Sequence, residues 1–214
     1  AVATSAVREA ENASEFLRRA REEAGMEVEV ISGMEEARLI HLGVIQALPL
    51  IDRRLLLIDI GGGSTEILVG EQGETITAAS LKVGALRLTR RFFADDELDP
   101  AAVEACRRFV RDAVAPYVKQ VRSAGFEVAV ASSGTAEAIA AMAAHRRDDQ
   151  PSPRSFNGFE VARKEVKAAV KALAGVPTVA ERRAIPGVES SRADILLAGA
   201  IVLEQVMGEL GVDR

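Results

Sequence analysis

The sequence predicts an α/β fold in which helices pack against a mixed β-sheet, and three observations lead to this prediction. Residues 55–58 form a continuous apolar run of strand length, which is typical of a central strand covered on both faces. Residues 67–70 resume the strand pattern after a glycine turn, so the two runs can pair as a hairpin. Residues 126–145 have the pattern of a strand, a Ser-Ser-Gly-Thr turn and a helix, which together form a βα unit.

Upstream of these strands, the pattern predicts a helix, a short strand and a second helix. Asn12 and Glu15 are spaced as an N-terminal cap for a helix over residues 13–24, which Gly25 ends. A strand is expected over residues 28–31. The second helix is expected over residues 34–47, because its apolar positions recur at helical spacing and Pro49 follows them.

After the hairpin, a third strand is expected over residues 75–83 and a helix over residues 85–92, so three antiparallel strands precede a helix. Asp99 and Pro100 predict the start of a long helix, because Asp caps helices and Pro is tolerated at their first position. This helix links two halves of the chain, and we expect a domain boundary between residues 98 and 99. Beyond the βα unit we expect a mobile polar loop over 146–154 and helices over 160–174, 178–183 and 191–208.

The composition disfavours several functional classes. The 214 residues carry a formal charge of −5, which argues against a nucleic-acid partner, because such proteins usually present a basic face. The single cysteine, Cys106, cannot form an internal disulfide, so a reducing cytoplasm is the expected compartment, with Cys106 in the packing. No apolar stretch approaches the ~20 residues of a membrane-spanning helix, so no membrane association is expected.

The strongest chemical signal lies between the two paired strands, in the run Asp59-Ile60-Gly61-Gly62-Gly63-Ser64-Thr65-Glu66. Three successive glycines allow backbone amides to surround an anion, for which phosphate is the natural candidate. A tight turn brings the carboxylates of Asp59 and Glu66 to the same mouth, where a divalent cation can bridge them to phosphate oxygens. The hydroxyls of Ser64 and Thr65 can add contacts. The alternative is an ordinary glycine-rich hairpin flanked by solvated acids.

Three further features allow two interpretations. Lys82, Arg87, Arg90 and Arg91 form a basic run that suits either a polyanion channel or a solvated helix face. The turn over residues 132–135 can hold a phosphate at a helix N-terminus or simply cap that helix, and capping is favoured. Neither histidine, His41 nor His145, has a metal-ligating partner at helical spacing, so both are interpreted as structural or exposed.

The run over residues 59–66, together with Ile31-Ser32-Gly33-Met34-Glu35-Glu36-Ala37-Arg38-Leu39-Ile40, resembles the exopolyphosphatase and guanosine pentaphosphate phosphohydrolase family. The segment Ala3-Thr4-Ser5-Ala6-Val7-Arg8 is similar to the family's preceding segment. The resemblance implies the actin-like and Hsp70-like fold of two ribonuclease H-like domains with a cleft between them. On this basis residues 1–98 are the remainder of the first domain, with the phosphate and metal site, and residues 99–214 are a mostly helical second domain.

Carried over to this sequence, the resemblance implies Glu36 as the catalytic base that deprotonates the attacking water. It implies Asp59 and Glu66 as Mg²⁺ ligands, and Gly61, Gly62 and Gly63 with Ser64 and Thr65 as the phosphate loop. Arg8 matches a phosphate-binding arginine, although a surface arginine is an equally good interpretation of its position. Without the resemblance, Glu35 and Glu36 would be an exposed first helical turn with an ion pair to Arg38.

The sequence departs from the family at both ends. The family begins with a strand and a phosphate loop of pattern Asp-x-Gly-Ser-Asn-Ser, and it continues into a strand and an Arg-Glu-Gly segment. Neither motif occurs in this sequence. We therefore expect the chain to be a segment of a longer protein that lacks the first hairpin and the C-terminal end.

Three functions are compatible with these patterns. The leading hypothesis is an Mg²⁺-dependent phosphohydrolase that releases terminal orthophosphate from inorganic polyphosphate or from the 5′ end of guanosine pentaphosphate. The second is a non-catalytic sensor that binds polyphosphate or a phosphorylated nucleotide. The third is an ATP-dependent sugar or acetate-type kinase, which the motif over residues 31–40 disfavours. The sequence leaves open the preferred substrate and its chain length, a need for monovalent cations, and the assembly as a monomer or homodimer.

Overall fold

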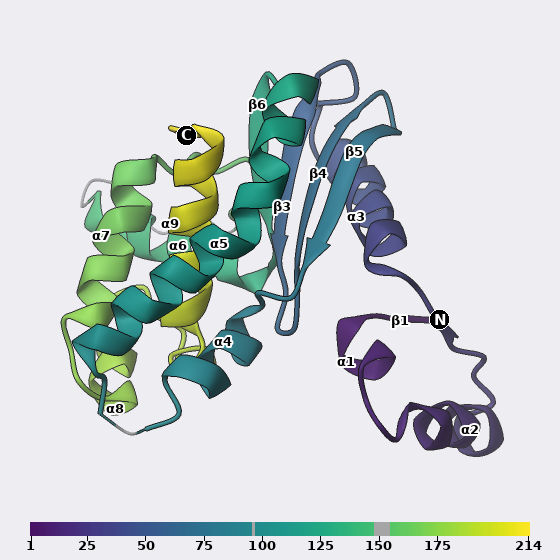
Figure 1. Ribbon diagram of the computed structural model, residues 1–214, viewed down its shortest axis with the longest axis horizontal. Helices are drawn as coiled ribbons and strands as arrows, with labels where there is room; N and C mark the ends of the chain where they lie inside the picture. The colour runs from purple at the N-terminus through teal and green to yellow at the C-terminus, as the bar shows by residue number, and fades with distance from the viewer. Residues whose placement is uncertain (96, 148–154) are drawn as a thin grey trace.

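The computed structural model describes residues 1–95, 97–147 and 155–214 (Figure 1). Most of the mobile loop expected over residues 146–154 lies outside the described residues. In the part of the chain that the structure describes, no helix has both the length and the apolar character that crossing a membrane requires.

A four-stranded sheet lies at the centre of the molecule (Figure 1). Its spatial order is β5-β4-β3-β6, from the strands β3 (Leu55–Ile60), β4 (Thr65–Glu71), β5 (Glu74–Leu81) and β6 (Val128–Ser132). The pairs β3–β4 and β4–β5 are antiparallel, so the predicted hairpin and third strand are confirmed. The β3–β6 pair is parallel and brings a strand from the second half of the chain beside β3.

Helices cover both faces of β3, as the continuous apolar run predicts. Leu56 and Ile58 belong to the larger core, which they share with residues of two long helices, α5 (Pro100–Ala124) and α9 (Leu196–Leu210). Leu55 and Leu57 point to the opposite face and pack with Ala37 of α3 (Gly33–Ala47). Because side chains alternate along a strand, every residue of β3 is buried.

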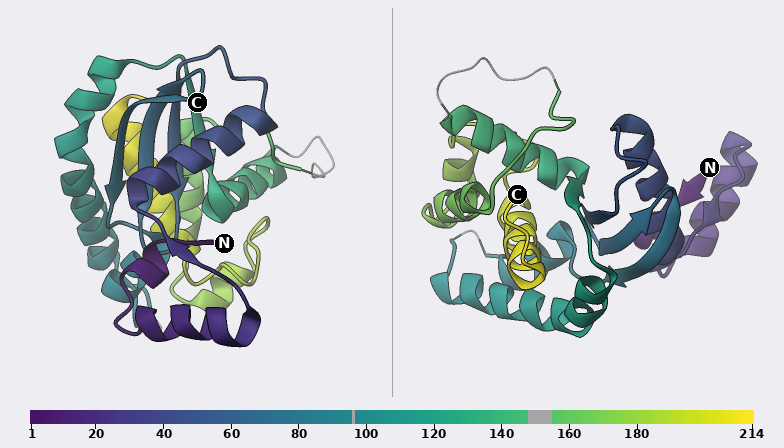
Figure 2. Two further views of the ribbon diagram at one scale, coloured as in Figure 1. Left: turned by 90° about the vertical axis from the view of Figure 1, so that its right-hand side faces the viewer. Right: turned by 90° about the horizontal axis from the view of Figure 1, so that it is seen from above.

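Further helices complete the helical layer, in which α9 is the most buried (Figure 2). They are α4 (Ala85–Phe92), α6 (Ser133–Arg146), α7 (Arg163–Ala174) and α8 (Val179–Arg183), and α4, α6 and α7 pack against α9. The predicted start of α5 is confirmed, because the Asp99 side chain accepts a hydrogen bond of 2.8 Å from the Ala101 amide and Pro100 opens the helix. Cys106 is fully buried in the core, as expected.

The N-terminal residues form a small separate unit beside the start of α3 (Figure 1). In it β1 (Val2–Ala3) pairs in parallel with β2 (Glu29–Val30), and α1 (Ser5–Arg8) and α2 (Ala13–Ala24) connect them. The bounds of α2 are those predicted. The two-residue strand β1 and the single-turn helix α1 were not predicted, because elements this short carry no periodic signal.

The division expected between residues 98 and 99 falls within the region that builds the four-stranded sheet. Strand β6 lies beyond that division, yet its partner β3 lies before it. Within the described residues, β1 and β2 form one sheet and β3 to β6 the other, and α3 connects them. The division into two domains at residues 98 and 99 stays a prediction.

Candidate active site

The turn between β3 and β4 brings the predicted carboxylates together. The Gly61 amide donates to the Ser64 carbonyl over 2.9 Å and closes the turn. Immediately behind it, Asp59 and Glu66 are direct partners in the antiparallel register. The residues at the two ends of the motif therefore share one edge of the sheet, as the hairpin prediction required.

The carbonyls of the glycine turn all face α4. Those of Gly61 and Gly62 accept hydrogen bonds from the amides of Ala85 and Arg87, over 2.9 and 3.0 Å, and Arg87 Nε donates to the Gly63 carbonyl over 2.7 Å. The amides of residues 62–64 donate no hydrogen bond to any group in the described ranges. With the carbonyls bonded to α4, these three amides are the donors that the turn has available for an anion.

Glu66 is fully buried, and one of its oxygens lacks a partner. The Ser80 hydroxyl donates to Oε1 over 2.7 Å, whereas Oε2 meets no donor among the described residues. Burial raises the pKa of Glu66 to about 7, and the charges of Glu36 and Asp59 add to the increase, while the Ser80 and Ser64 hydroxyls oppose it. A carboxylate in this environment is poised to gain a cation.

Asp59 sits beside Glu66 and is also buried. Burial raises its pKa, and a hydrogen bond from the Ser132 hydroxyl partly offsets that increase. Ser132 is the register partner of Asp59 on β6. The next residue, Ser133, donates to the Ile60 carbonyl over 2.7 Å, so α6 begins directly against the end of β3.

Glu36 lies in the first turn of α3, on the side that faces the N-terminal unit. Ser32 caps this helix by accepting from the Glu35 amide over 3.1 Å. Glu35 forms the predicted exposed ion pair with Arg38, at 2.7 Å, but Glu36 takes no part in it. Its side chain is only 14% exposed, and its Oε2 lies 3.6 Å from Arg8 Nη1 without a hydrogen bond.

Arg8 comes to this site from the end of α1. Its Nη1 donates to the Ile31 carbonyl over 2.7 Å, just before α3 begins. This bond fixes the guanidinium next to Glu36, so two residues that are 28 positions apart in the sequence meet as an ion pair. Arg8 is therefore not an isolated surface arginine.

The structure does not place the Thr65 hydroxyl at the mouth of the turn. Thr65 is fully buried and donates to the Val83 carbonyl over 2.7 Å. The hydroxyl anchors β4 to the segment before α4, and this placement does not support the expectation that it adds a phosphate contact. Ser64 is also buried, and its hydroxyl helps to lower the pKa of Glu66 through a side-chain hydrogen bond.

Sequence reasoning missed two contacts near the site, one by Ser132 and one by Arg192. Ser132 was expected in a capping turn, yet its hydroxyl bonds Asp59 and α6 has no side-chain cap. Arg192 lies with its guanidinium directly over Gly134, in the space that a β-carbon there would occupy. Both contacts join residues that are dozens of positions apart, and no local pattern signals them.

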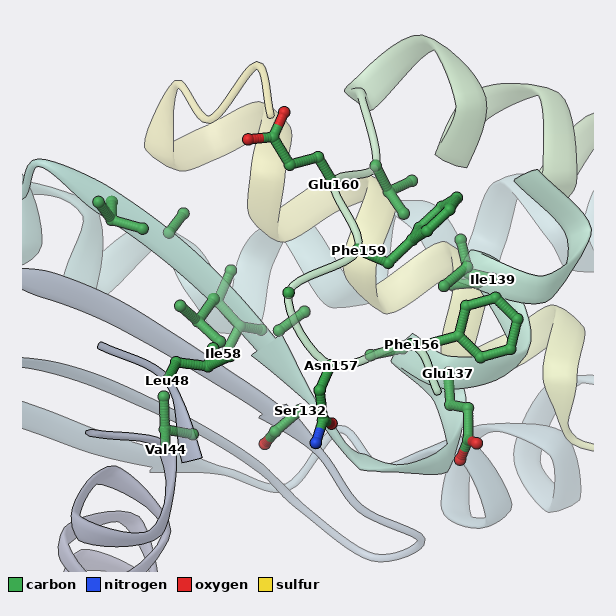
Figure 3. Close-up of a pocket in the computed structure, with 18 of the residues that line it drawn as sticks. Val44, Leu48, Ile58, Ser132, Glu137, Ile139, Phe156, Asn157, Phe159 and Glu160 are labelled. Carbon is green, nitrogen blue, oxygen red and sulfur yellow. The ribbon is translucent and has the colours of Figure 1, made fainter. Parts of the chain in front are cut away.

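A groove of about 910 Å³ runs along the free edge of β6 (Figure 3). Its labelled lining includes the apolar side chains of Ile58, Ile139, Phe156 and Phe159. Ser132 borders it, but Arg8, Glu36 and the glycine turn do not. The groove therefore lies next to the candidate site without forming part of it.

The two carboxylates at the turn, as metal ligands, suit Mg²⁺ better than a metal whose ligands all come from the protein. Within residues 1–95, 97–147 and 155–214, no group of three or more His, Cys, Asp or Glu side chains is placed to hold a metal. Mg²⁺ commonly binds through one or two carboxylates and completes its shell with water and phosphate oxygens. The carboxylates of Asp59 and Glu66, with the unpartnered Oε2 of Glu66, meet that requirement.

Comparison with known proteins agrees with this geometry. A sequence model of the Ppx/GppA phosphatase family matches residues 1–214. An exopolyphosphatase from Cytophaga hutchinsonii superposes with a TM-score of 0.84 at 28% identity, covering 97% of this chain and 66% of that one. A Ppx/GppA family member from Aquifex aeolicus gives a TM-score of 0.78 at 28% identity, covering 99% and 67%.

An exopolyphosphatase-like protein also matches, with a TM-score of 0.82 at 27% identity, covering 98% of this chain and 66% of that one. The chain spans about two thirds of the length of these related structures. These similarities confirm the fold that the sequence motifs imply.

Proposed function

The chain belongs to the Ppx/GppA phosphatase family, and we propose that the protein is a phosphohydrolase that releases orthophosphate from the end of a phosphoanhydride chain. The observation that carries this proposal is the position of the unbonded amides of residues 62–64 beside the buried carboxylates of Asp59 and Glu66. The substrates we propose are inorganic polyphosphate and the 5′ end of guanosine pentaphosphate. Similarity to an exopolyphosphatase supports the first.

Phosphate binding rests on groups of the turn and on Arg8. The amides of residues 62–64 surround the oxygens of the terminal phosphate, and the Arg8 guanidinium approaches from α1. Asp59 and Glu66 would hold Mg²⁺, which when bound neutralises charge on the phosphate oxygens. Glu66 must lose its proton to do so, and its pKa of about 7 allows this at neutral pH.

The chemical step is assigned to Glu36. Its Oε2 is buried and has no hydrogen-bond donor among the described residues, so it can accept a hydrogen bond from a water molecule. Glu36 takes a proton from that water as the water oxygen bonds to the terminal phosphorus. The bond from phosphorus to the bridging oxygen breaks, and the shortened chain leaves with its negative charge on that oxygen.

The experiment that tests this function measures orthophosphate release from long-chain polyphosphate and from guanosine pentaphosphate, with Mg²⁺ and with a chelator. We expect release that requires Mg²⁺. Replacing Glu36→Gln should lower kcat by about a hundredfold or more, because general-base catalysis contributes at least that factor. Glu35→Gln is the matched control, since it removes a neighbouring exposed carboxylate from the same helical turn.

The possible outcomes separate the functions. If the Glu36→Gln variant releases orthophosphate as fast as the wild type, Glu36 is not the catalytic base. Binding of polyphosphate without release, by the wild-type protein with Mg²⁺, would overturn the hydrolase proposal and favour the sensor alternative. Comparison of the two substrates ranks them, since both present a terminal phosphoanhydride to the same turn.

A further inference from the structure

Arg87 differs from the other residues of the basic run that follows β5. Lys82 and Arg90 are exposed, and the guanidinium of Arg91 lies over the ring of Phe109 at 4.1 Å from its centroid. Arg87 binds the glycine turn, where its side chain is 35% exposed, whereas Lys82 reaches this region only through an exposed ion pair of 3.7 Å with Glu9. The basic run is therefore mostly a solvated helix face, with one member drawn into the site.

Three bonds of Arg87 connect two parts of the candidate site. Its amide donates to the Gly62 carbonyl over 3.0 Å, and its Nε donates to the Gly63 carbonyl over 2.7 Å. Its Nη2 donates to Glu9 Oε2 over 2.6 Å. The two side-chain bonds use different nitrogens of one planar guanidinium, an arrangement that the single ammonium group of a lysine does not reproduce.

Glu9 links this arginine to α1. It is the residue that follows Arg8 and caps the C-terminus of α1. The hydrogen bond from Arg87 holds the pKa of Glu9 below its usual value, with smaller contributions from the charges of Lys82 and Arg8. The carboxylate is therefore ionised at neutral pH, and the ion pair between α1 and α4 persists there.

A second contact between α1 and the turn lies close by. Ser5, the first residue of α1, is buried against Gly63, and a β-carbon at Gly63 would lie 2.6 Å from Ser5 Oγ. That same β-carbon would lie 3.7 Å from Arg87 Nη2. Gly63 thus lies close to both Ser5 and Arg87. The segment that contains α1 meets the turn directly through Ser5 and indirectly through the Glu9–Arg87 ion pair.

We propose that Arg87 is a positioning residue of the phosphate site. It holds the Gly63 carbonyl toward α4, which leaves the neighbouring amides facing the anion, and through Glu9 it fixes α1 and Arg8 against the turn. Arg87 thus acts through the turn and Arg8 and does not itself bind substrate. This inference rests on the proposed function of the turn as a phosphate site.

The test compares Arg87→Gln with Arg90→Gln, which removes the same charge from an exposed position of the same helix. We expect Arg87→Gln to raise KM for polyphosphate about tenfold or more, since it removes two charge-assisted hydrogen bonds, and Arg90→Gln to leave KM nearly unchanged. Arg87→Lys should not restore KM. Glu9→Gln should raise KM by a smaller factor, and the double variant Glu9→Gln/Arg87→Gln should be no worse than Arg87→Gln alone.

A direct substrate contact by Arg87 predicts other results. Glu9→Gln would then leave KM unchanged or lower it, because the arginine would be released for the phosphate. Rescue by Arg87→Lys, or equal effects of Arg87→Gln and Arg90→Gln, would also overturn the proposal. If Arg87→Gln does not fold, Glu9→Gln decides the question, since that variant keeps the Arg87 bonds to the turn.

Amide hydrogen exchange gives a readout that does not depend on activity. In Arg87→Gln we expect faster exchange at Gly61 and Ala85, whose amide bonds close the turn and join it to α4, and in residues 5–9. Arg90→Gln should exchange like the wild-type protein in these segments. Unchanged exchange in Arg87→Gln would overturn the positioning role even if the protein hydrolyses polyphosphate. Changed exchange in a protein that neither binds nor hydrolyses polyphosphate would instead show that the proposed function, and not the coupling, is at fault.

Discussion

Asp59 and Glu66 face each other as register partners across the β3–β4 ladder, and both carboxyl groups are buried at the edge where the glycine turn begins. Burial removes hydration from both carboxylates and raises the pKa of each, and for Glu66 the charges of Glu36 and Asp59 add a smaller increase. A hairpin needs no such pair for its stability. Under the proposed function, a cation held by these two carboxylates would offset this cost.

The first prediction concerns the stability cost of Glu66. Its pKa is near 4.5 in the unfolded chain and about 7 in the folded one, so the folded protein loses stability as pH rises through this interval. We expect the free energy of unfolding of the metal-free Glu66→Gln variant to increase relative to that of the wild type across that interval. By pH 8 the relative increase should reach roughly 3 kcal/mol at most. Denaturant unfolding at a series of pH values measures this difference. A constant difference from pH 5 to pH 8 would contradict it.

The second prediction concerns Mg²⁺. Binding requires that Glu66 be ionised, so Mg²⁺ should raise the melting temperature more at pH 8 than at pH 6. Asp59→Asn should abolish this stabilisation, whereas the exposed Glu35→Gln should retain it. Thermal unfolding with and without Mg²⁺ tests both expectations. Equal stabilisation of wild type and Asp59→Asn would show that the ion binds elsewhere.

Local signals were enough to predict most of the elements. Gly25 ends α2, and Asp99 with Pro100 starts α5, because helix ends depend on a few neighbouring residues. Asn12 precedes α2 as predicted, but its side chain makes no capping hydrogen bond. The glycine turn likewise predicted the meeting of Asp59 and Glu66. In each of these cases the residues that determine the structure are close together in the sequence.

The parts of the fold and of the site that were not predicted depend on pairings between residues far apart in the sequence. The parallel pairing of β6 with β3 joins segments that are more than 70 positions apart, and it places Ser132 on Asp59. The Glu9–Arg87 ion pair spans 78 positions. Neither pairing has a periodic or motif signal, so Ser132 was expected to cap α6 and Arg87 was one of several basic residues on a helix.

The third prediction concerns His41, which is fully buried in α3 with both ring nitrogens unpartnered among the described residues. Burial lowers its pKa below the usual 6.5. The unfolded chain therefore binds more protons below about pH 6.5, and His41 makes the protein less stable as pH falls. Glu66 acts in the opposite direction over the same pH range, so a variant is needed to separate the two.

We expect His41→Phe to retain stability on acidification better than the wild type, because it keeps a ring against Gly70 and removes the titrating group. His145→Gln is the control, since His145 is exposed. Unfolding free energies between pH 5 and pH 7.5 provide the measurement. Parallel curves for His41→Phe and the wild type would mean that His41 does not titrate in this range.

The fourth prediction compares two glycine-to-alanine substitutions with different surroundings. A β-carbon at Gly63 meets Ser5 Oγ at 2.6 Å, whereas a β-carbon at Gly43, inside α3, meets nothing within 4 Å. Gly43→Ala should therefore stabilise the protein by about 0.5–1 kcal/mol through helix propensity and leave hydrolysis unchanged. Gly63→Ala should push α1 away from the turn and raise KM for polyphosphate.

Adding Ser5→Ala to Gly63→Ala removes the colliding oxygen and leaves the next contact, Ser5 Cβ, at 3.4 Å. The double variant should therefore recover part of the loss, and a double variant as impaired as Gly63→Ala would show that the distance between Ser5 and Gly63 does not set the geometry of the turn.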